Sequence, residues 1–278
     1  MATYDKMLLA ALYNGTQGHV KSSSYFPILW VKCVNADYPD ATVAVNAGGD
    51  IAFTTNGTTA DTTVNTTGTL DLSTPAATLN TLGEVADMIN ASANWVAIIL
   101  GGTRDMGVDG IFYTTTEANA AGVNGLFLYG DCSVTGGPSS EAYYCFAISA
   151  FDPAKITAKP SDGSTPEPDA GCQSILSYVK WLINASTAGN ALLYIYSSSQ
   201  TADQCIYGPI NIDNTTTTDG VLGGPPLFKS RLGERLVIRL QSDATMASAA
   251  ATLVAQGLSI DWSADDFVSG YVLANAAG

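Results

Sequence analysis

Short runs of β-forming residues recur along this chain, and each run stops at residues that favour turns. Phe26–Val34 lies between serines and an asparagine, and Asn94–Leu100 stops at two glycines. Runs of this length that are rich in branched and aromatic residues predict strands. The run at Asn94–Leu100 is almost entirely apolar, which predicts a strand covered on both faces. Further strands are expected at residues 143–149, 191–196, 235–240 and 257–262.

Residues 41–74 are dominated by Thr, Asn, Gly and Asp. Val43 and Val45 alternate with small residues, and Asn56-Gly57 is a strong signal for a tight turn between two strands. The pattern predicts a meander of short strands whose threonines face solvent, with a low-complexity segment as the alternative. The expected strands of this meander lie at residues 41–46, 50–54, 63–64 and 69–72.

Helical spacing replaces the strand pattern near residues 82–90, where Leu82, Val85 and Ile89 fall on one face. Thr81 and Glu84 form a capping-box pattern, in which each side chain satisfies an exposed backbone donor of the other residue. The same spacing predicts a second amphipathic helix at residues 173–184 and a third at residues 247–255.

An internal similarity accompanies the first two helices. Ile89-Asn-Ala-Ser92 and Ile183-Asn-Ala-Ser186 are identical, and each follows an expected helix and precedes an apolar strand. This arrangement indicates either two related ββαβ-type units or a chance match in a chain rich in Ala, Ser and Asn.

Together these patterns predict a strand-rich α+β fold, with mixed sheets and a few amphipathic helices. Residues 152–171 concentrate Pro, Gly, Ser and Asp, as exposed loops and domain boundaries do. We therefore expect an N-terminal strand-rich domain at residues 1–150 and a C-terminal α+β domain at residues 151–278, with a single domain as the alternative.

The charge balance argues against two kinds of partner. The chain has 11 Lys and Arg against 25 Asp and Glu, a net charge of −14, and only 13% of its residues are charged. Nucleic-acid backbones and anionic membranes attract clustered basic residues, so we expect neither as a partner. No apolar run approaches the roughly 18 residues of a membrane-spanning helix. The densest basic group is expected to pair with acidic neighbours or with a partner subunit, and it comprises Lys229, Arg231, Arg235 and Arg239.

Two further features bear on the cell compartment. Residues 1–15 lack a basic head and a clear cleavage site, so we expect a short helix or docking arm there instead of a signal peptide. Five cysteines with no CxxC spacing are expected to be free and mostly buried, although a bridge between Cys132 and Cys145 stays open. The five are Cys33, Cys132, Cys145, Cys172 and Cys205.

Catalytic patterns are missing from the sequence. His19 is the one histidine, and no nucleophile motif or phosphate-binding loop accompanies it. Acidic and amide residues in the stretch 211–224 do not have the spacing of a calcium loop, so solvated side chains are expected for Asn211, Asp213, Asn214 and Asp219. We predict no catalytic residue, no cofactor and no metal site. A hydrolase that uses two dispersed carboxylates is the catalytic alternative.

Residues 81–110 resemble a segment of virion structural proteins of tailed bacteriophages, in which a capped helix T-L-x-E-V-x-x-x-I-N-A runs into an apolar strand that contains Trp. The matching positions are Thr81, Leu82, Glu84, Val85, Ile89, Asn90, Ala91 and Trp95. The resemblance covers this segment alone. It implies a capsid decoration or accessory head component without catalytic residues.

Surface chemistry leads to the same expectation. Thr, Asn, Ser and Tyr can be buried against a neighbour without the desolvation cost of charged groups. We therefore expect a non-enzymatic virion structural protein that assembles in the host cytoplasm, forms homo-oligomers and binds the capsid lattice. Loops 55–68 and 211–224 and the two chain ends are the expected contact surfaces. The alternatives are a receptor-binding fibre or adhesin module and a surface-layer or cell-wall protein.

Overall fold

The computed structural model describes residues 19–21, 25–72, 79–108, 111–131, 142–149, 151–184, 189–214, 217–242 and 250–261. Strands make up most of this part, together with the helix α2 (Leu82–Ala91) and the short 3-10 helix η2 (Pro153–Lys155). The predicted strand-rich α+β class is confirmed, although the described residues contain one α-helix where several were expected.

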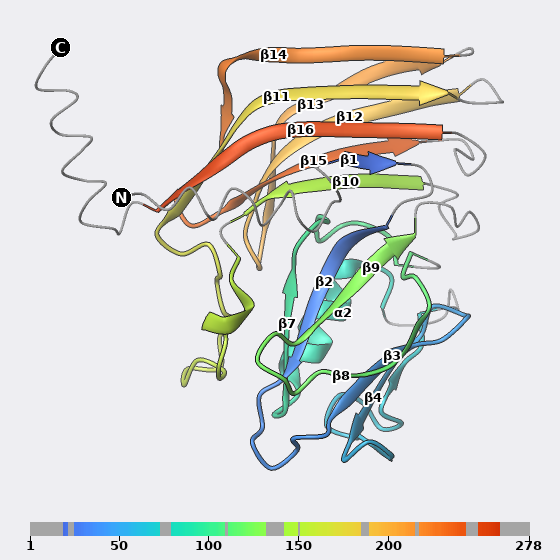
Figure 1. The fold of residues 1–278 in the computed structure, drawn as a ribbon, viewed down its shortest axis with the longest axis vertical. Helices are drawn as coiled ribbons and strands as arrows, with labels where there is room; N and C mark the ends of the chain where they lie inside the picture. The colour runs from blue at the N-terminus through green and yellow to red at the C-terminus, as the bar shows by residue number, and fades with distance from the viewer. Residues whose placement is uncertain are drawn as a thin grey trace, which may run out of the picture.

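Eight of the described strands form two four-stranded antiparallel sheets that face each other at the top of Figure 1. One sheet has the order β1-β16-β11-β14 and the other has the order β10-β15-β12-β13. We call this unit the roll. Its strands are β1 (His19–Lys21), β10 (Ala142–Ile148), β11 (Cys172–Asn184), β12 (Gly189–Ser198), β13 (Asp203–Asn214), β14 (Thr217–Lys229), β15 (Arg235–Ser242) and β16 (Ala250–Asp261).

The pairing within the roll is nested. Its first strand pairs with its last, β1 with β16, and its second with the last but one, β10 with β15. Moving inward, β11 pairs with β14 and β12 pairs with β13. A long antiparallel hairpin that is folded over in this way, with its pairs shared between two sheets, is the double-sheet jelly roll.

A second unit interrupts the roll between β1 and β10. We call residues 25–131 the insert, and it lies below the roll in Figure 1. In its described part, one sheet has the order β7-β2-β9, another has the order β5-β4-β3-β8, and β6 pairs with β4. The insert contains α2 and the strands β2 (Tyr25–Cys33), β3 (Thr42–Val45), β4 (Ile51–Thr55), β5 (Thr59–Ala60), β6 (Thr69–Leu70), β7 (Trp95–Ile99), β8 (Thr115–Asn119) and β9 (Leu126–Asp131).

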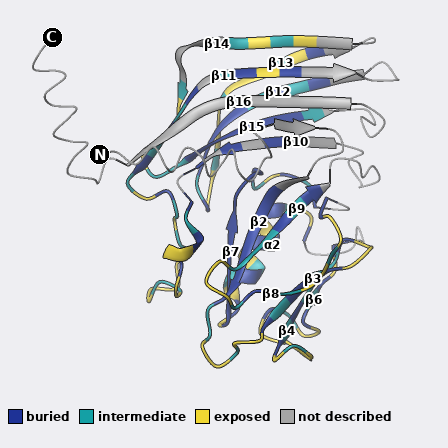
Figure 2. Cartoon of the chain, in the orientation of Figure 1, coloured by how far each residue is buried: buried dark blue, intermediate teal, exposed yellow. Residues whose placement is uncertain are grey.

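The strand β7 is covered on both faces, as its apolar run predicts, and it is uniformly buried in Figure 2. Trp95, Ala97 and Ile99 belong to the main core, whereas Val96 and Ile98 pack in a second cluster with Phe151 and Ile156. The last two residues belong to residues 151–171, which we call the strap. The predicted loop is therefore a cover for the sheet β7-β2-β9.

Two lysines, one on the insert and one on the strap, hold the strap in place. Lys32 Nζ donates to the carbonyl oxygen of Ile156 at 2.8 Å, and Lys159 Nζ donates to that of Asn90 at 2.6 Å and to that of Ser92. The second contact places a cation at the C-terminus of α2, where the helix dipole favours positive charge.

The roll contains strands from both sides of the predicted domain boundary. β1 and β10 precede the expected boundary at residues 150/151, yet they pair with strands that follow it. One main core also contains side chains of both units, such as Ile99 of the insert and Leu240 of the roll. Independent folding of residues 1–150 and 151–278 stays a prediction.

Several local predictions are confirmed. Thr81 caps α2, because Glu84 N donates to Thr81 Oγ1 at 3.3 Å and Thr81 N donates to Glu84 Oε2 at 3.0 Å. Asn56 and Gly57 form the tight turn after β4, with φ values of 50° and 74°. The stretch 63–64, which was expected to continue the meander, is a turn instead.

The helix predicted at residues 173–184 is wrong, because these residues form β11. A bulge between Leu176 and Tyr178 shifts the alternation of the strand, so that its buried residues Leu176 and Val179 are three positions apart. That spacing imitates a helix face, whereas pairing with β14 and β16 on both sides decides the outcome. Because these residues form a strand, the second of the two predicted ββαβ-type units lacks its helix, and the predicted repeat is also wrong. The helix predicted at 247–255 is also wrong over residues 250–255, which belong to β16.

A buried carboxylate organises the lower part of the insert. Asp61 Oδ1 accepts hydrogen bonds from Thr63 N at 2.9 Å and Thr63 Oγ1 at 2.7 Å. Asp61 Oδ2 accepts from Asn94 Nδ2 and Trp95 Nε1, each at 2.8 Å. Burial by itself raises the pKa of Asp61, but these hydrogen bonds outweigh it and hold the pKa below its usual value. The ionised carboxylate thus ties the turn after β5 to the start of β7.

We expect the substitution Asp61→Asn to lower the free energy of unfolding by about 2 kcal/mol at pH 7. The amide NH2 group would then face hydrogen-bond donors in place of a carboxylate oxygen that accepts from them. The carboxylate contributes most to the free energy of unfolding above its unfolded pKa of about 3.9. This contribution disappears as pH falls through the lower folded pKa. Urea unfolding of the wild type and the variant should therefore converge on acidification. The exposed control Asp37→Asn should change little, and a constant difference between pH 7 and pH 2 would contradict the role of the charge.

Candidate functional site

One contact between the insert and the roll lies on the outer face of the sheet β10-β15-β12-β13. Along β15, Leu236, Ile238 and Leu240 point into the core of the roll. Arg235 and Arg239 alternate with them and are nevertheless buried. They are buried because residues 100–106 of the insert cover them, and we call this contact the seam.

Arg235 is the central side chain of the seam and is 1% exposed. Its Nε donates to Leu100 O at 3.1 Å, its Nη2 to Gly102 O at 3.2 Å and its Nη1 to Ser199 O at 3.2 Å. Burial lowers the pKa of Arg235, and carboxylates that include Asp169 oppose this effect. The guanidinium thus joins the buried carbonyl groups of Leu100 and Gly102 to the half-buried carbonyl group of Ser199.

Arg239 makes the second connection across the seam. Its Nη1 donates to Thr103 Oγ1 at 2.5 Å and to Asp105 Oδ1 at 2.7 Å, and its Nη2 donates to the Tyr196 hydroxyl at 2.6 Å. The guanidinium carbon lies 4.7 Å from the ring centre of Tyr196 and 5.1 Å from that of Tyr194. Burial raises the pKa of Tyr196, so this phenol stays protonated at neutral pH.

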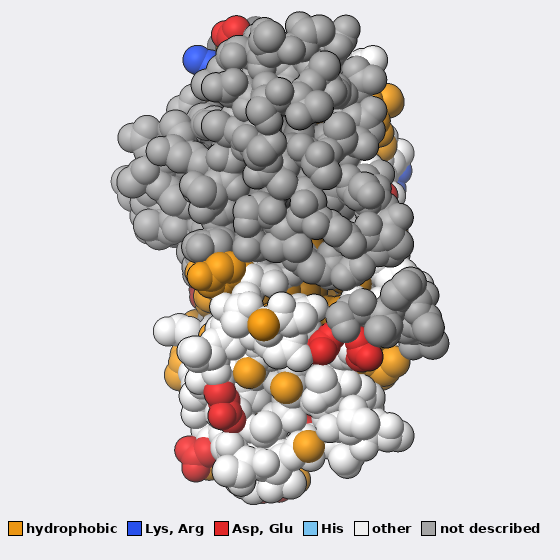
Figure 3. All heavy atoms as spheres, turned by 90° about the vertical axis from the view of Figure 1, so that its right-hand side faces the viewer, with side chains coloured by type: hydrophobic (Ala, Val, Ile, Leu, Met, Phe, Trp, Pro, Cys, Tyr) orange, Lys and Arg blue, Asp and Glu red, His pale blue; other side chains and the backbone are white. Residues whose placement is uncertain are grey.

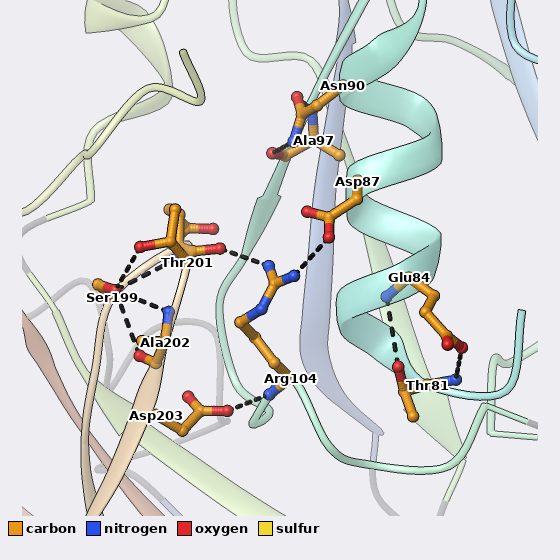
Figure 4. Close-up of polar contacts among 11 residues, drawn as sticks. Thr81, Glu84, Asp87, Asn90, Ala97, Arg104, Ser199, Thr201, Ala202 and Asp203 are labelled. Atoms are coloured by element: carbon orange, nitrogen blue, oxygen red, sulfur yellow. Dashed lines mark hydrogen bonds and ion pairs between the residues drawn. The ribbon is translucent and has the colours of Figure 1, made fainter.

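The turn between β12 and β13 completes the seam (Figure 4). Gln200 binds the backbone of Ile99 twice, since Ile99 N donates to Gln200 Oε1 at 2.7 Å and Gln200 Nε2 donates to Ile99 O at 3.0 Å. Arg104 N donates to Asp203 Oδ2 at 2.5 Å, and Arg104 Nη2 pairs with Asp87 Oδ2 at 2.5 Å. The Ser199 hydroxyl accepts from Ala202 N at 3.0 Å and so shapes the turn.

Of the four basic residues predicted to pair with acids, two are buried in the seam and two are exposed. Arg239 pairs with Asp105 as expected. Arg235 is satisfied by carbonyl groups. Lys229 and Arg231 are exposed on the surface of the roll. Sequence patterns do not report this division, because Arg235 and Arg239 become buried only when the insert docks.

Burial raises the pKa of two described thiols, Cys33 and Cys145. Cys33, Cys145 and Cys205 are free, so the bridge between Cys132 and Cys145 does not form. Burial raises the pKa of Cys145 to about 12, and its Sγ lies 3.6 Å from Met106 Sδ. Cys145 is therefore a protonated packing residue of the seam. Cys132 lies outside the described residues, and so does the side chain of His19 on β1.

The residues considered for a calcium loop do not share one loop. Asn211, Asp213 and Asn214 belong to β13, whereas Asp219 belongs to β14 in the other sheet. The surface loop expected at 211–224 is thus wrong, since these residues form two strands apart from the link at 215–216, which is not described. Among the described residues, no group of three or more His, Cys, Asp or Glu is placed to hold a metal ion. No described helix is long and apolar enough to cross a membrane.

The expected contact surfaces have different outcomes. Within loop 55–68, Asn56, Thr58 and Thr59 are exposed. The chain ends 1–18 and 262–278 lie outside the described residues. Sequence reasoning missed two exposed apolar side chains, Val123 at 69% exposure and Leu232 at 64%. Each has a glycine beside it, a turn signal that could have drawn attention to these loops.

The chain was compared with family models, curated proteins and solved structures. No family model, no curated protein and no solved structure matches the chain.

We expect Arg235→Met to lower the free energy of unfolding by about 3 kcal/mol, because it removes the donor to the carbonyl group of Ser199 and leaves those of Leu100 and Gly102 buried without it. The matched control Arg231→Met changes an exposed arginine four positions away and should shift stability by less than about 0.5 kcal/mol. Chemical denaturation of both variants measures the difference. Equal stabilities would show that the seam does not depend on the buried guanidinium.

Proposed function

We propose that this chain is a non-enzymatic structural subunit of a bacteriophage particle, of the capsid decoration or accessory head type. The observation that carries the proposal is the nested strand order of the roll. Viral capsid proteins are among the main users of the double-sheet jelly roll. Because a fold alone does not define a function, the proposal also draws on the surface and on the roles of the ionisable groups.

The surface of the insert suits contact between subunits. The face of the insert drawn in Figure 3 is mostly uncharged, with separate hydrophobic side chains and a few acidic ones. On the outer face of the sheet β5-β4-β3-β8, the Thr42 hydroxyl lies 2.7 Å from that of Thr54 and donates to Glu117 Oε1 at 2.5 Å. Hydroxyl groups of this kind lose less on desolvation than charges do.

The ionisable groups described above act within the fold. Arg235 and Arg239 hold the seam, Asp61 holds the lower insert, and Cys145 is kept protonated by burial. The proposal therefore assigns no catalytic residue, cofactor or metal to the chain. Its partners are copies of itself and a capsid lattice, met in the host cytoplasm during assembly. The net charge of −14 disfavours contact with packaged nucleic acid.

A receptor-binding adhesin is the second candidate, because lectin domains also use the jelly roll. Tyr194 favours this reading, since it is half-buried and lies beside Tyr196 with ring centres 5.8 Å apart. Aromatic faces with a polar edge suit binding surfaces. A glycan-binding screen separates the candidates: binding that is lost in Tyr194→Ala supports the adhesin, and no binding supports the lattice component.

The main proposal is tested on particles. Phage particles from cells that carry this gene are purified on a density gradient, and their proteins are quantified by mass spectrometry. We expect the chain to sediment with the particles at many copies each, and to dissociate from them before the shell opens. Absence of the chain from washed particles would remove the proposal.

A further inference from the structure

One exposed turn of the roll is built to hold an apolar side chain in solvent. Residues 229–233, which we call the roll turn, begin at the last residue of β14. Ser230 is buried at its centre, donates through Oγ to Glu234 O at 2.7 Å, and donates through N to Ser174 O at 2.8 Å. Gly233 N donates to Cys172 O at 2.7 Å. The turn is therefore fixed before any partner arrives, which lowers the entropic cost of binding.

The roll turn combines apolar and cationic groups. Leu232 is 64% exposed, and Lys229 and Arg231 beside it are exposed. Neither cation forms an ion pair with any residue that the structure describes. An exposed leucine with two cations next to it resembles the anchor of a binding surface, in which an apolar group is desolvated and charges select the partner.

The insert has the opposite charge. Residues 25–131 contain 11 acidic residues and only two basic ones, Lys32 and Arg104. Lys32 is buried, and Arg104 is paired with Asp87. Every basic side chain that the structure describes as exposed therefore lies outside the insert. The cationic roll turn and the acidic insert thus carry charges of opposite sign.

Two acidic and two apolar exposed residues lie in two connected loops of the insert. Asp37, Pro39 and Asp40 are exposed in the connection between β2 and β3, at the lower end of the insert in Figure 1. Asn119 Nδ2 donates to Pro39 O at 3.0 Å and so joins this connection to the loop that carries Val123. We call these four exposed residues, Asp37, Pro39, Asp40 and Val123, the distal patch.

The distal patch is also fixed in advance. Trp30 Nε1 donates to Asn124 O at 2.6 Å, and Lys32 Nζ donates to Val123 O at 3.2 Å. Two buried side chains therefore hold the backbone of this loop while Val123 points outward at 69% exposure. The loop is organised for contact, since it keeps its shape with the apolar group in water.

We infer that the roll turn of one copy binds the distal patch of a second copy. Lys229 and Arg231 face Asp37 and Asp40 in this contact, and Leu232 packs against Val123 and Pro39. The two surfaces belong to different units, so the contact is head-to-tail and can repeat from copy to copy. The inference rests on the proposed function, to which it adds the contact by which subunits join. The contact weakens as salt rises, because its charges lie at the rim.

Charge exchange tests the inference with the full chain. Sedimentation velocity over a concentration series measures self-association of four proteins: the wild type, K229E/R231E, D37K/D40K and the variant with all four changes. We expect each two-residue variant to weaken association by roughly tenfold or more, because like charges then face each other. The four-residue variant should associate again. An equimolar mixture of the two-residue variants should also associate, since the roll turn of each variant then faces a distal patch of opposite charge on the other.

Controls with the same change of charge lie away from both surfaces. K155E/K180E matches the first variant and D162K/D219K matches the second, and all four positions are exposed. Both controls should associate as the wild type does. The inference is overturned if the controls weaken association equally, if the four-residue variant stays apart, or if the wild type is a monomer throughout. In each case the chain can still be found on particles, so the particle experiment decides the proposed function separately.

Discussion

The burial of two arginines on the outer face of one roll sheet holds the molecule together. A strand of a two-sheet sandwich normally turns one face to the core and the other to water. β15 departs from this rule, because all residues from Arg235 to Leu240 are buried. Arg235 and Arg239 can be buried only because carbonyl groups, Asp105 and two tyrosine rings surround them. The position of residues 100–106 of the insert and the turn at Ser199 both follow from this requirement.

The parts of the fold that depend on neighbouring residues could be predicted from the sequence. The capped helix at Leu82–Ala91, the turn at Asn56-Gly57 and the doubly covered strand at Trp95–Ile99 each have a local signal that the structure confirms. β11 could not be predicted, because its bulge places buried residues at helical spacing and its partners β14 and β16 lie far along the chain. Strand pairs of the roll such as β1 with β16 and β10 with β15 are far apart in the sequence, so no pattern among neighbouring residues predicts their pairing.

The candidate surfaces follow the same division. Composition predicted uncharged polar faces, and on the insert Thr42 and Thr54 lie half-buried beside Glu117. The stretch 211–224 was chosen for its Thr and Asn content, yet strand pairing with β11 and β12 uses most of it. The roll turn and the distal patch were missed because their exposure depends on buried residues elsewhere, Ser230 in one case and Trp30 with Lys32 in the other.

The pairing of β1 with β16 has a consequence for the order of events on the ribosome. His19 is opposite Val254, so the first strand of the roll waits for the last one to be synthesised. The insert, by contrast, has all of its own strand partners once residue 131 has emerged. Closing so long a loop costs little more entropy than closing a moderate one, but it delays folding. The nascent chain would therefore present a finished insert ahead of an unfinished roll, whose unpaired strand edges stay open to other nascent copies until translation ends.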